Sequence, residues 1–412
     1  MTRRNDRFVA GLDIGTTKIC CAIAERDEGG GLDIIGIGQS ASRGLRKGIV
    51  VNVDQTVGAL KAAVEEAELM AGVSVDRAFV GVAGGHIRGF NSRGVITISG
   101  RDRQVTREDI DRVIESARSV QLPADRIIFH TVPQDYILDG QDEIRDPLGM
   151  TGSRLEANVH IVTGSIPSLS NITNCVNRAG IEVAEMVLEQ LAAARSTLLS
   201  DEKELGVALV DIGGGTTDLA VFQNGAICHT AVLPIGGDNF TNDIAVGLRT
   251  PVPEAERIKI KYGCSLATMV ADDQVIDVPS VGGRKPRVLS RHILCEILQP
   301  RTEEVFGLLR AEIAAAGYED CLTSGIVIAG GGAILDGVPE IAEQIFDLPV
   351  RRGVPYGVGG LVDGVSSPMH STVVGLVQHG NSSPARAVPV AASIQMLDKV
   401  SSKVKTLFRG IL

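Results

Sequence analysis

The stretch FVAGLDIGTTKICCAIAE at residues 8–25 returns in closely related form as GVALVDIGGGTTDLAVFQ at residues 206–223. Each copy contains an apolar run, a turn rich in glycine and threonine, and a second apolar run, which together are typical of a β-hairpin. Asp13 and Asp211 begin the two turns. Backbone N–H groups and threonine hydroxyls in such turns are suited to binding phosphate. Two copies therefore predict that a polyphosphate is held between two halves of the protein.

Length and composition indicate a multidomain globular protein. A chain of 412 residues exceeds one ordinary core and predicts roughly two to four domains. Hydrophobic residues make up 44% and charged residues 22%, and the 48 glycines fit a protein with many tight turns. The formal net charge of −10 argues against a general nucleic-acid binder, so we expect no nucleic-acid partner.

Cysteine usage and hydropathy indicate a cytosolic body. The seven cysteines are scattered through apolar stretches without a CxxC pair, which favours reduced core residues over metal ligands. The start MTRRNDR runs directly into a strand, so a secretory signal is not expected. No apolar run approaches the roughly 18 residues needed to span a bilayer. Any membrane contact would therefore come from the protein's surface.

Strand and helix patterns continue after the first hairpin. LDIIGIGQSAS at residues 32–42 alternates like a third strand. Residues 48–72 predict a short strand and then an amphipathic helix, with Leu60, Val64, Ala67 and Leu69 on one side and its end at Gly72. Residues 85–164 predict a strand, a helix, a strand and a strand, a compact α+β unit inserted into the first half. Its helix opens with Thr106, Glu108 and Asp109, a good N-terminal signal.

A third glycine-rich element lies in SGIVIAGGGAILDGVPEIAEQIF at residues 324–346. It predicts a buried strand, a turn at Gly330, Gly331 and Gly332, and a helix, which would place N–H donors near the α-phosphate or ribose of a nucleotide. Close packing alone also explains such glycines. The two hairpins elsewhere in the chain favour the nucleotide.

Three motifs together resemble one superfamily. DIGTTK at 13–18, DIGGGTTD at 211–218 and IVIAGGGAIL at 326–335 resemble the two phosphate motifs and the adenosine motif of the actin, DnaK-type chaperone and sugar-kinase superfamily. MVLEQLAAARSTLL at 186–199 and STVVGLVQHG at 371–380 resemble its two connecting segments. The resemblance spans residues 8 to about 380. It implies an α/β, actin-like, two-lobed ATPase fold.

Within this superfamily the chain resembles the FtsA family of bacterial division actins. The inserted unit at 85–164 matches the place of FtsA's own extra, SHS2-like subdomain, and residues 253–264 and 288–313 are similar to its second-lobe helical subdomain. The resemblance implies a first-lobe core at 1–84, 165–206 and 362–380, and the insert at 85–164. It places the second-lobe core at 207–240 and 322–361, the helical subdomain at 241–321, a linker at 381–396 and a terminal helix at 397–412.

The tail supports this resemblance independently. A linker rich in proline, serine and alanine precedes MLDKVSSKVKTLFRGIL at residues 396–412. At about 100° per residue, one side of a helix carries the apolar residues and the other the cations. The apolar side holds Leu397, Val400, Val404, Leu407, Phe408, Ile411 and Leu412, and the remainder holds Lys399, Lys403, Lys405 and Arg409. The pattern predicts an amphipathic membrane anchor, with a helix docked on the core as the alternative.

The resemblance implies that ATP and Mg²⁺ bind between the hairpins. Asp13 would organise Mg²⁺ through its water shell, and Asp211 would lie near Mg²⁺ or near the attacking water. The predicted phosphate ligands in the first hairpin are Gly15, Thr16, Thr17 and Lys18. Those in the second are Gly213, Gly214, Gly215, Thr216 and Thr217. A solvated lysine is the alternative for Lys18.

Further nucleotide contacts are implied at four places. Gly236 and Gly237 resemble the superfamily's second-lobe glycine turn, and Gly330, Gly331 and Gly332 would lie behind the α-phosphate and adenosine. Glu256 and Lys259 would contact ribose and adenine, or form an ordinary surface ion pair. Because no residue plainly reads the base edge, ATP rather than GTP is inferred from the family alone.

Hydrolysis would require a group that positions water in line with the γ-phosphate. Glu189 falls where related proteins place a glutamate before proline, but this chain has Gln190 at the proline position. Glu189 is the predicted water-positioning residue, and capping of the helix is its alternative role. We expect at most slow ATPase activity, with ATP acting mainly as a structural ligand.

The family resemblance also implies a biological role. The chain would polymerise on the inner face of the cytoplasmic membrane at the division site, tether FtsZ by its C-terminal peptide and recruit later division proteins. Candidate residues for the acidic peptide are Arg287, Arg291 and Arg301, beside Arg284 and Lys285. A PilM-like pilus-assembly protein and a sugar-type kinase are the alternatives. The terminal anchor favours the division protein over both.

Overall fold

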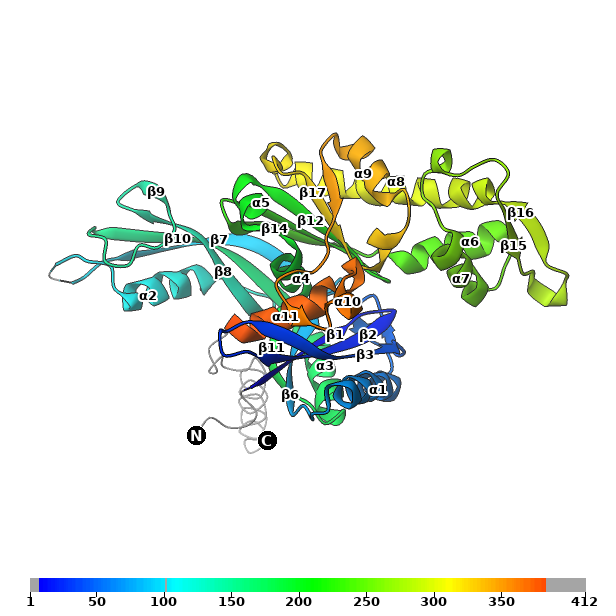
Figure 1. Ribbon diagram of the computed structural model, residues 1–412. Coiled ribbons are helices and arrows are strands. Elements are labelled where there is room, and N and C mark those ends of the chain that lie inside the picture. Colours follow the sequence, from blue (N-terminus) through cyan, green and yellow to red (C-terminus); the bar gives the residue numbers. More distant parts are fainter. Residues whose placement is uncertain (1–6, 101, 383–412) are drawn as a thin grey trace, which may run out of the picture.

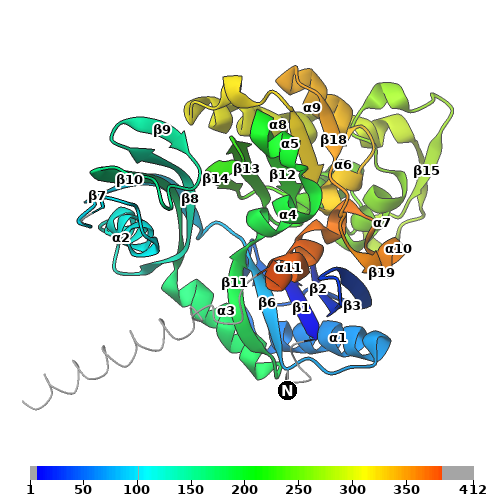
Figure 2. The same cartoon turned by 60° about the vertical axis from the view of Figure 1, so that its left-hand side comes forward.

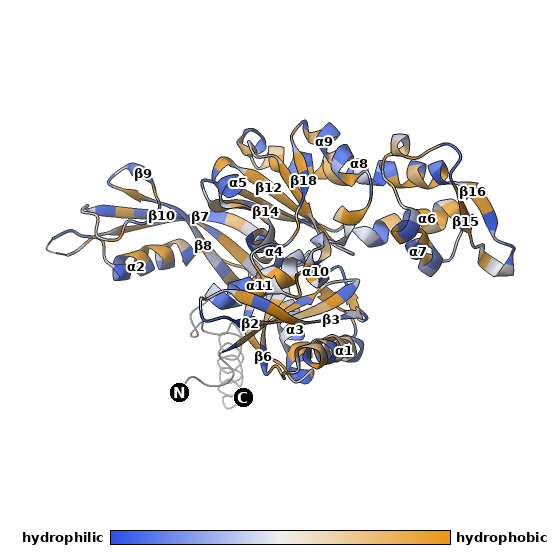
Figure 3. Ribbon diagram, viewed as in Figure 1, coloured by the Kyte–Doolittle hydropathy of each residue, from blue (hydrophilic) through white to orange (hydrophobic). Residues whose placement is uncertain are grey.

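The computed structural model describes residues 7–100 and 102–382. Two lobes, each built around a twisted sheet, lie one above the other, and an additional unit projects from the pair at each end (Figure 1). In Figure 3 hydrophobic residues concentrate on the central strands of both lobes. The predicted terminal helix and most of the predicted linker lie outside the described residues.

The first lobe contains a six-stranded sheet in the order β11-β6-β1-β2-β3-β19. The first repeated stretch forms its antiparallel hairpin, in which Asp13 lies opposite Cys20. The predicted third strand pairs with the hairpin's second arm. The strand bounds are β1 Phe8–Ile14, β2 Lys18–Arg26, β3 Leu32–Ala41, β6 Arg77–Val82, β11 Glu182–Leu188 and β19 Gly359–Gly360, with the small β4 Leu45–Arg46 and β5 Ile49–Val50 pair beside them.

Helices cover both faces of this sheet. Helices α1 (Val53–Ala71) and α3 (Ile166–Arg178) pack on one face, and α11 (Ser371–Ser382) packs on the other (Figure 2). Helix α1 ends at Gly72 with a left-handed φ of 68°, as predicted. Leu60, Val64 and Ala67 are buried, but the prediction for Leu69 was wrong, because it is 86% exposed. Two residues after Ala67, its side chain points about 200° away from the buried stripe.

The insert is a four-stranded sheet with one helix on one face. Its strand order is β7-β10-β8-β9, and it includes a short strand that the sequence did not predict. The bounds are β7 Arg88–Thr97, α2 Arg107–Arg118, β8 Arg126–Leu138, β9 Gln141–Ile144 and β10 Arg154–Ser165. A capping box begins α2: the Asp109 N–H donates to the Thr106 hydroxyl, and Asp109 accepts from the Thr106 N–H. The N-terminal signal is therefore confirmed.

The second lobe repeats the plan with a five-stranded sheet in the order β14-β13-β12-β17-β18. The second repeated stretch forms its central hairpin, in which Asp211 lies opposite Asp218. The bounds are β12 Val207–Ile212, β13 Thr217–Gln223, β14 Ala226–Leu233, β17 Ile326–Ala329 and β18 Val350–Arg352. After β17 the glycines form a 3₁₀ turn at Gly331–Ile334, and the expected helix, α9, begins only at Val338 and ends at Phe346.

The far end of the second lobe is helical, as the family resemblance implied for residues 241–321. It contains α6 Gly237–Leu248, α7 Val252–Tyr262 and the long α8 Arg291–Ala315. A small hairpin of β15 (Val275–Val278) and β16 (Arg287–Ser290), which the sequence did not predict, forms its outer tip (Figure 1).

Two connecting helices lie between the sheets. Helix α4 (Glu189–Thr197) packs against α11, and its alanines also contact the second-lobe sheet. Helices α5 (Ser200–Leu205) and α10 (Val362–Val365) complete the connections. Among the described residues, no helix is both long and apolar enough to cross a membrane.

Candidate functional site

A cavity of about 680 Å³ lies between the lobes, beneath the two repeated hairpins. Its walls come from both hairpin turns, the first residue of α4, the start of α6, the middle and end of α7, the glycine turn after β17, and the segment before α11. The predicted residues on these walls are Asp13, Gly15, Thr16, Thr17, Lys18, Glu189, Asp211, Gly213, Gly214, Gly215, Thr216, Gly237, Glu256, Lys259, Gly330, Gly331 and Gly332. Folding thus brings together motifs that lie far apart in the sequence.

The two hairpin turns face one another at close range. A Cβ placed on Gly214 would lie 1.8 Å from Thr17 Oγ1, and one on Gly215 would lie 2.7 Å from Thr16 Oγ1. Only a glycine therefore permits this approach. The Gly48 N–H donates to Thr16 Oγ1 over 3.2 Å, which orients the threonine from the first lobe.

Two predicted ligands do not line the cavity. Thr217 is fully buried in β13, and its hydroxyl donates to the Ile235 carbonyl over 2.8 Å. Gly236 lies behind the second hairpin, where an added Cβ would be 2.7 Å from the carbonyl oxygens of Gly213 and Gly214. The N–H of Gly237 donates to the Gly213 carbonyl over 2.8 Å. The glycine turn therefore braces the second hairpin.

Six carboxyl groups line the cavity: Asp13, Glu189, Asp211 and Asp218, whose pKa values are raised, and Glu256 and Asp336. Burial raises the pKa of Asp13, and Lys18 opposes this. Burial and the three neighbouring aspartates raise the pKa of Glu189 well above its ordinary value. Burial and the neighbouring carboxylate raise the pKa of Asp211 to about 7 and that of Asp218 to about 8. The cavity wall thus attracts cations at this point.

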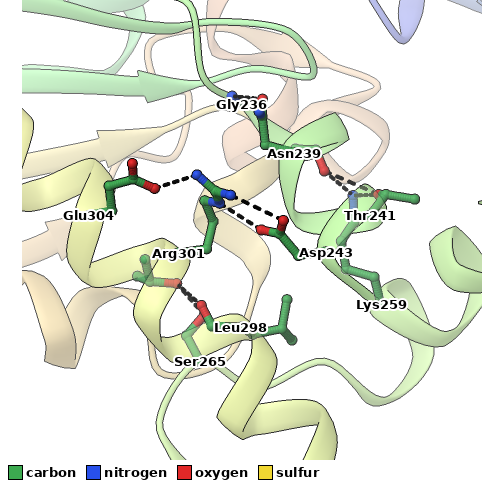
Figure 4. A network of polar contacts seen from close by, with 11 residues as sticks. Gly236, Asn239, Thr241, Asp243, Lys259, Ser265, Leu298, Arg301 and Glu304 are labelled. Carbon is green, nitrogen blue, oxygen red and sulfur yellow. Dashed lines mark hydrogen bonds and ion pairs between the residues drawn. The ribbon is translucent and has the colours of Figure 1, made fainter. Parts of the chain in front are cut away.

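Two of the three lysines that line the cavity, Lys18 and Lys259, are held by hydrogen bonds to its wall. Lys18 Nζ donates to the Met369 carbonyl over 2.5 Å, so it is fixed rather than fully solvated. Lys259 Nζ lies 2.7 Å from Glu256 Oε2 and also donates to the Gly237 carbonyl and the Thr241 hydroxyl. Figure 4 shows Lys259 pointing at the start of α6 beside Thr241. The predicted ion pair is present, and it lies on the cavity wall.

Two features of the position of Gly330 favour glycine over any other residue. Its φ of 81° is in the left-handed region, and an added Cβ would lie 2.2 Å from Asp211 Oδ1. The third glycine-rich element therefore packs directly against the second repeated hairpin, and a side chain at this position would clash with Asp211.

The three arginines predicted for a partner peptide occupy different surroundings. Arg291 lies on the cavity wall, where Nε donates to the Tyr262 carbonyl over 2.7 Å. Arg301 forms ion pairs with Asp243 and Glu304 (Figure 4). Exposed Arg287 donates to the Leu248 carbonyl. They do not form one basic patch.

Sequence reasoning missed several residues that line the cavity or lie directly behind it. Thr372 at the start of α11 donates to Asp211 Oδ2 over 3.3 Å. Gln190 is 1% exposed and donates to Asp218 Oδ1 over 3.0 Å. Ile260, Ile334 and Leu335 form an apolar part of the wall. Thr372, Gln190, Ile334 and Leu335 lie within the quoted motifs but at positions to which no role was assigned, and the glutamine in EQLAAA marks a departure from the superfamily pattern.

The donor set is compatible with magnesium coordinated largely by water and ligand phosphate. Within residues 7–100 and 102–382 no group of three or more His, Cys, Asp or Glu side chains is arranged to hold a metal ion by itself. Mg²⁺ commonly takes one or two carboxylates, keeps several waters and binds substrate phosphates. Asp13 and Asp211, with raised pKa values that a nearby cation would offset, fit that pattern.

Comparisons with known proteins agree with this geometry. The family model described as Cell division protein FtsA matches residues 208–375, and that described as SHS2 domain inserted in FTSA matches residues 84–163. Cell division protein FtsA of Pseudomonas aeruginosa is 52% identical over 377 residues, 92% of this chain and 90% of the relative.

Solved structures show similarity of fold. The PilM-PilN type IV pilus biogenesis complex matches with a TM-score of 0.68 and 14% identity, over 91% of this chain and 99% of the matched one. MreB5 of Spiroplasma citri, solved bound to ADP, matches with a TM-score of 0.52 and 16% identity, over 90% of this chain and 95% of its own.

Proposed function

The chain belongs to the FtsA family of cell division proteins, with an actin-like fold and an inserted SHS2 domain. On this premise we propose that it binds ATP with Mg²⁺ between its lobes and assembles into actin-like filaments on the inner face of the cytoplasmic membrane. There it tethers FtsZ and recruits later division proteins. The observation that carries the nucleotide part is the pair of phosphate hairpins facing each other across one cavity.

The polyphosphate would lie in the cavity that both turns line. Backbone N–H groups of the glycines and the hydroxyl of Thr16 offer donors there, and Lys18 adds positive charge. Asp13 and Asp211 would hold Mg²⁺, which neutralises the phosphate charge when bound. The base would lie toward the apolar wall of Ile260, Ile334 and Leu335, between α7 and the glycine turn. The ADP-bound MreB5 of the same fold supports a nucleotide in this cleft.

The membrane and partner roles rest on the family and on the tail sequence. A single basic amphipathic helix binds a membrane weakly and reversibly. Filament formation would place many such helices along one surface, so that avidity makes attachment persistent. The second-lobe helical subdomain, residues 241–321, is the proposed site for the acidic C-terminal peptide of FtsZ. With Arg291 on the cavity wall and Arg301 already paired, exposed Arg287 is the most accessible of the three arginines to such a peptide.

ATP acts mainly as a structural ligand in this proposal, and hydrolysis is slow. The alternatives, a pilus-assembly protein and a sugar-type kinase, share the fold. Membership of the FtsA family and the basic amphipathic tail favour the division role over both.

Isothermal titration of the full chain with ATP and Mg²⁺ tests nucleotide binding. We expect saturable binding that Asp13→Asn weakens at least about tenfold, because the variant removes one carboxylate from the proposed metal site. The matched control is Asp54→Asn, whose carboxylate is highly exposed on α1 and pairs with Arg178; it should bind like the unmodified chain. Absence of binding, or equal affinity for all three proteins, would contradict the proposal.

A further inference from the structure

Gln190 is a buried polar residue placed directly behind the cavity. It follows cavity residue Glu189 in the first turn of α4 and is only 1% exposed. Its Nε2 donates to Asp218 Oδ1 over 3.0 Å, whereas its Oε1 is buried without a hydrogen-bond partner among the described residues. A buried polar atom left unpaired costs about 1–3 kcal/mol. Stability alone therefore favours an apolar side chain at this position.

Asp218, which accepts this hydrogen bond, accepts a hydrogen bond at each of its two carboxyl oxygens. Thr216 Oγ1 donates to Oδ2 over 2.9 Å, and Gln190 Nε2 donates to Oδ1. Asp218 is 4% exposed and lines the cavity. One of its two hydrogen bonds comes from its own hairpin and the other from α4, the helix between the lobes. The two bonds together fix the plane of a carboxyl group that would otherwise rotate.

We propose that Gln190 is a positioning residue for ATP hydrolysis, and that it acts by fixing the Asp218 carboxylate toward the water that attacks the γ-phosphate. This inference rests on the proposed binding of ATP between the hairpins. In the step, the water oxygen bonds to the γ-phosphorus while the bond from that phosphorus to the β–γ bridging oxygen breaks. One water proton passes to Asp218, and ADP and inorganic phosphate leave.

The geometry distinguishes Asp218 from the other cavity carboxylates. Asp13 and Asp211 are the proposed magnesium ligands. Glu189 Oε1 lies near Gly81, where an added Cβ would be 3.4 Å away, and no side chain among the described residues is recorded as donating to its carboxylate. Of Asp13, Glu189, Asp211 and Asp218, only Asp218 is oriented by two side-chain donors. Glu256, which also lines the cavity, is held by Thr241 and Lys259 on the wall formed by α6 and α7. A fixed carboxylate is suited to hold one water in a single orientation.

The test measures ATP affinity and phosphate release separately on the full chain. Asp218→Asn should lower kcat about a hundredfold, and Gln190→Met should lower it about tenfold. ATP affinity should stay within about twofold in both variants. Methionine keeps the volume of glutamine and removes the unpaired oxygen, which offsets the loss of the donor to Asp218 Oδ1, so the thermal midpoint of Gln190→Met should change little. A merely structural glutamine would give the opposite pattern, with lost stability and unchanged kcat.

The double variant and a matched control complete the test. If Gln190 acts through Asp218, Gln190→Met causes no further loss of kcat in the Asp218→Asn background. Gln378→Ala is the control, because its Nε2 is also bonded and its Oε1 also unpaired, but it lies on α11 away from the cavity. Multiplicative losses in the double variant, or full turnover by Asp218→Asn, would overturn the inference. Failure of the unmodified chain to bind ATP would instead overturn the proposed function.

Discussion

At the scale of single residues, the cavity depends on groups that would repel one another without a ligand. Asp13, Asp211 and Asp218 crowd one wall, and burial is the largest cause of their raised pKa values. A cation bound among them stabilises their charged forms. Glycines at 214 and 330 leave no space for a side chain at the places where the walls come closest. This part of the wall is therefore suited to a charged ligand and not to the packing of apolar side chains.

Gly214→Val tests the contact between the hairpins. The added Cβ would lie 2.9 Å from Thr17 Cβ as well as 1.8 Å from its hydroxyl oxygen, so the two turns must separate. We expect ATP affinity to fall at least about tenfold, because both turns must contact one polyphosphate.

Gly58→Ala is the control for this substitution. Gly58 lies within α1, and nothing lies within 4 Å of its added Cβ. The alanine should raise the free energy of unfolding by about 0.5–1 kcal/mol and leave ATP affinity unchanged. Equal ATP affinity in Gly214→Val and the unmodified chain would show that the two turns do not bind one ligand.

Single-residue roles were only partly predictable from the sequence. Phosphate-turn residues were predictable because a short motif fixes both the turn and the directions of its N–H groups. Thr217 is a threonine like Thr216, but successive side chains of a strand point to opposite faces. The hydroxyl of Thr217 therefore points to Ile235 and away from the cavity. Arg291 was grouped with Arg287 and Arg301 because the three arginines are close together in the sequence. Sequence proximity does not show that Arg291, the first residue of α8, lies on the cavity wall. A role for Gln190 could be inferred only from the structure, which places its side chain beside Asp218.

At the scale of elements, the insert belongs to the first lobe by sequence and contacts the second lobe in space. Strands β7, β8 and β10 pack against β14 (Figure 2). Gln134 Nε2 donates to the Ile227 carbonyl over 2.8 Å, and Asn91 Nδ2 donates to the Cys228 carbonyl over 3.0 Å. His160, fully buried, connects Asn91 to Thr230. The insert therefore bridges both lobes.

This contact should be sensitive to acid. Asn91 Oδ1 only accepts, so Nδ1 of His160 carries the hydrogen and Nε2 accepts from the Thr230 hydroxyl. Burial lowers the pKa of His160 from its ordinary value to about 4. The unfolded chain binds the proton more readily, so this contribution to stability is complete above about pH 6.5 and is lost as the pH falls toward 4.

Urea unfolding of the full chain and of His160→Gln between pH 7.5 and 5 measures this contribution. The unmodified chain should lose roughly 2 kcal/mol more than the variant over that range, because only its folded state excludes the proton from position 160. Comparing the two proteins cancels the opposite trend expected from the cavity aspartates. Parallel pH curves would mean that His160 does not titrate in this way.

Elements with local signals were predicted well, and their docking was not. The two hairpins, α1 and the capped α2 follow from periodicity and caps within about 20 residues. The β15–β16 hairpin was not predicted because its strands are only four residues long and lie within a charged section. The contact of the insert with β14 joins residues such as Asn91 and Cys228. Local sequence patterns do not predict a contact between residues so far apart in the chain.

At the scale of the whole molecule, the repeated hairpin explains the two-lobed plan. Each copy forms the centre of one sheet, and the helices α4 and α11 cross between the sheets. A ligand bound by both hairpins therefore joins the lobes, and closure of the cleft would set the surfaces that neighbouring subunits meet. In this account ATP controls assembly, and assembly in turn strengthens attachment to the membrane through many weak anchors.

Co-sedimentation with anionic phospholipid vesicles tests this central claim most directly. The full chain and a version ending at Ser393 would each be incubated with ATP, Mg²⁺ and a labelled C-terminal peptide of FtsZ. We predict that only the full chain pellets with the vesicles, that it carries the peptide with it, and that omitting ATP reduces the pelleted fraction. If both versions stay in the supernatant without the peptide, or if both pellet equally, the account of a nucleotide-dependent membrane tether is contradicted.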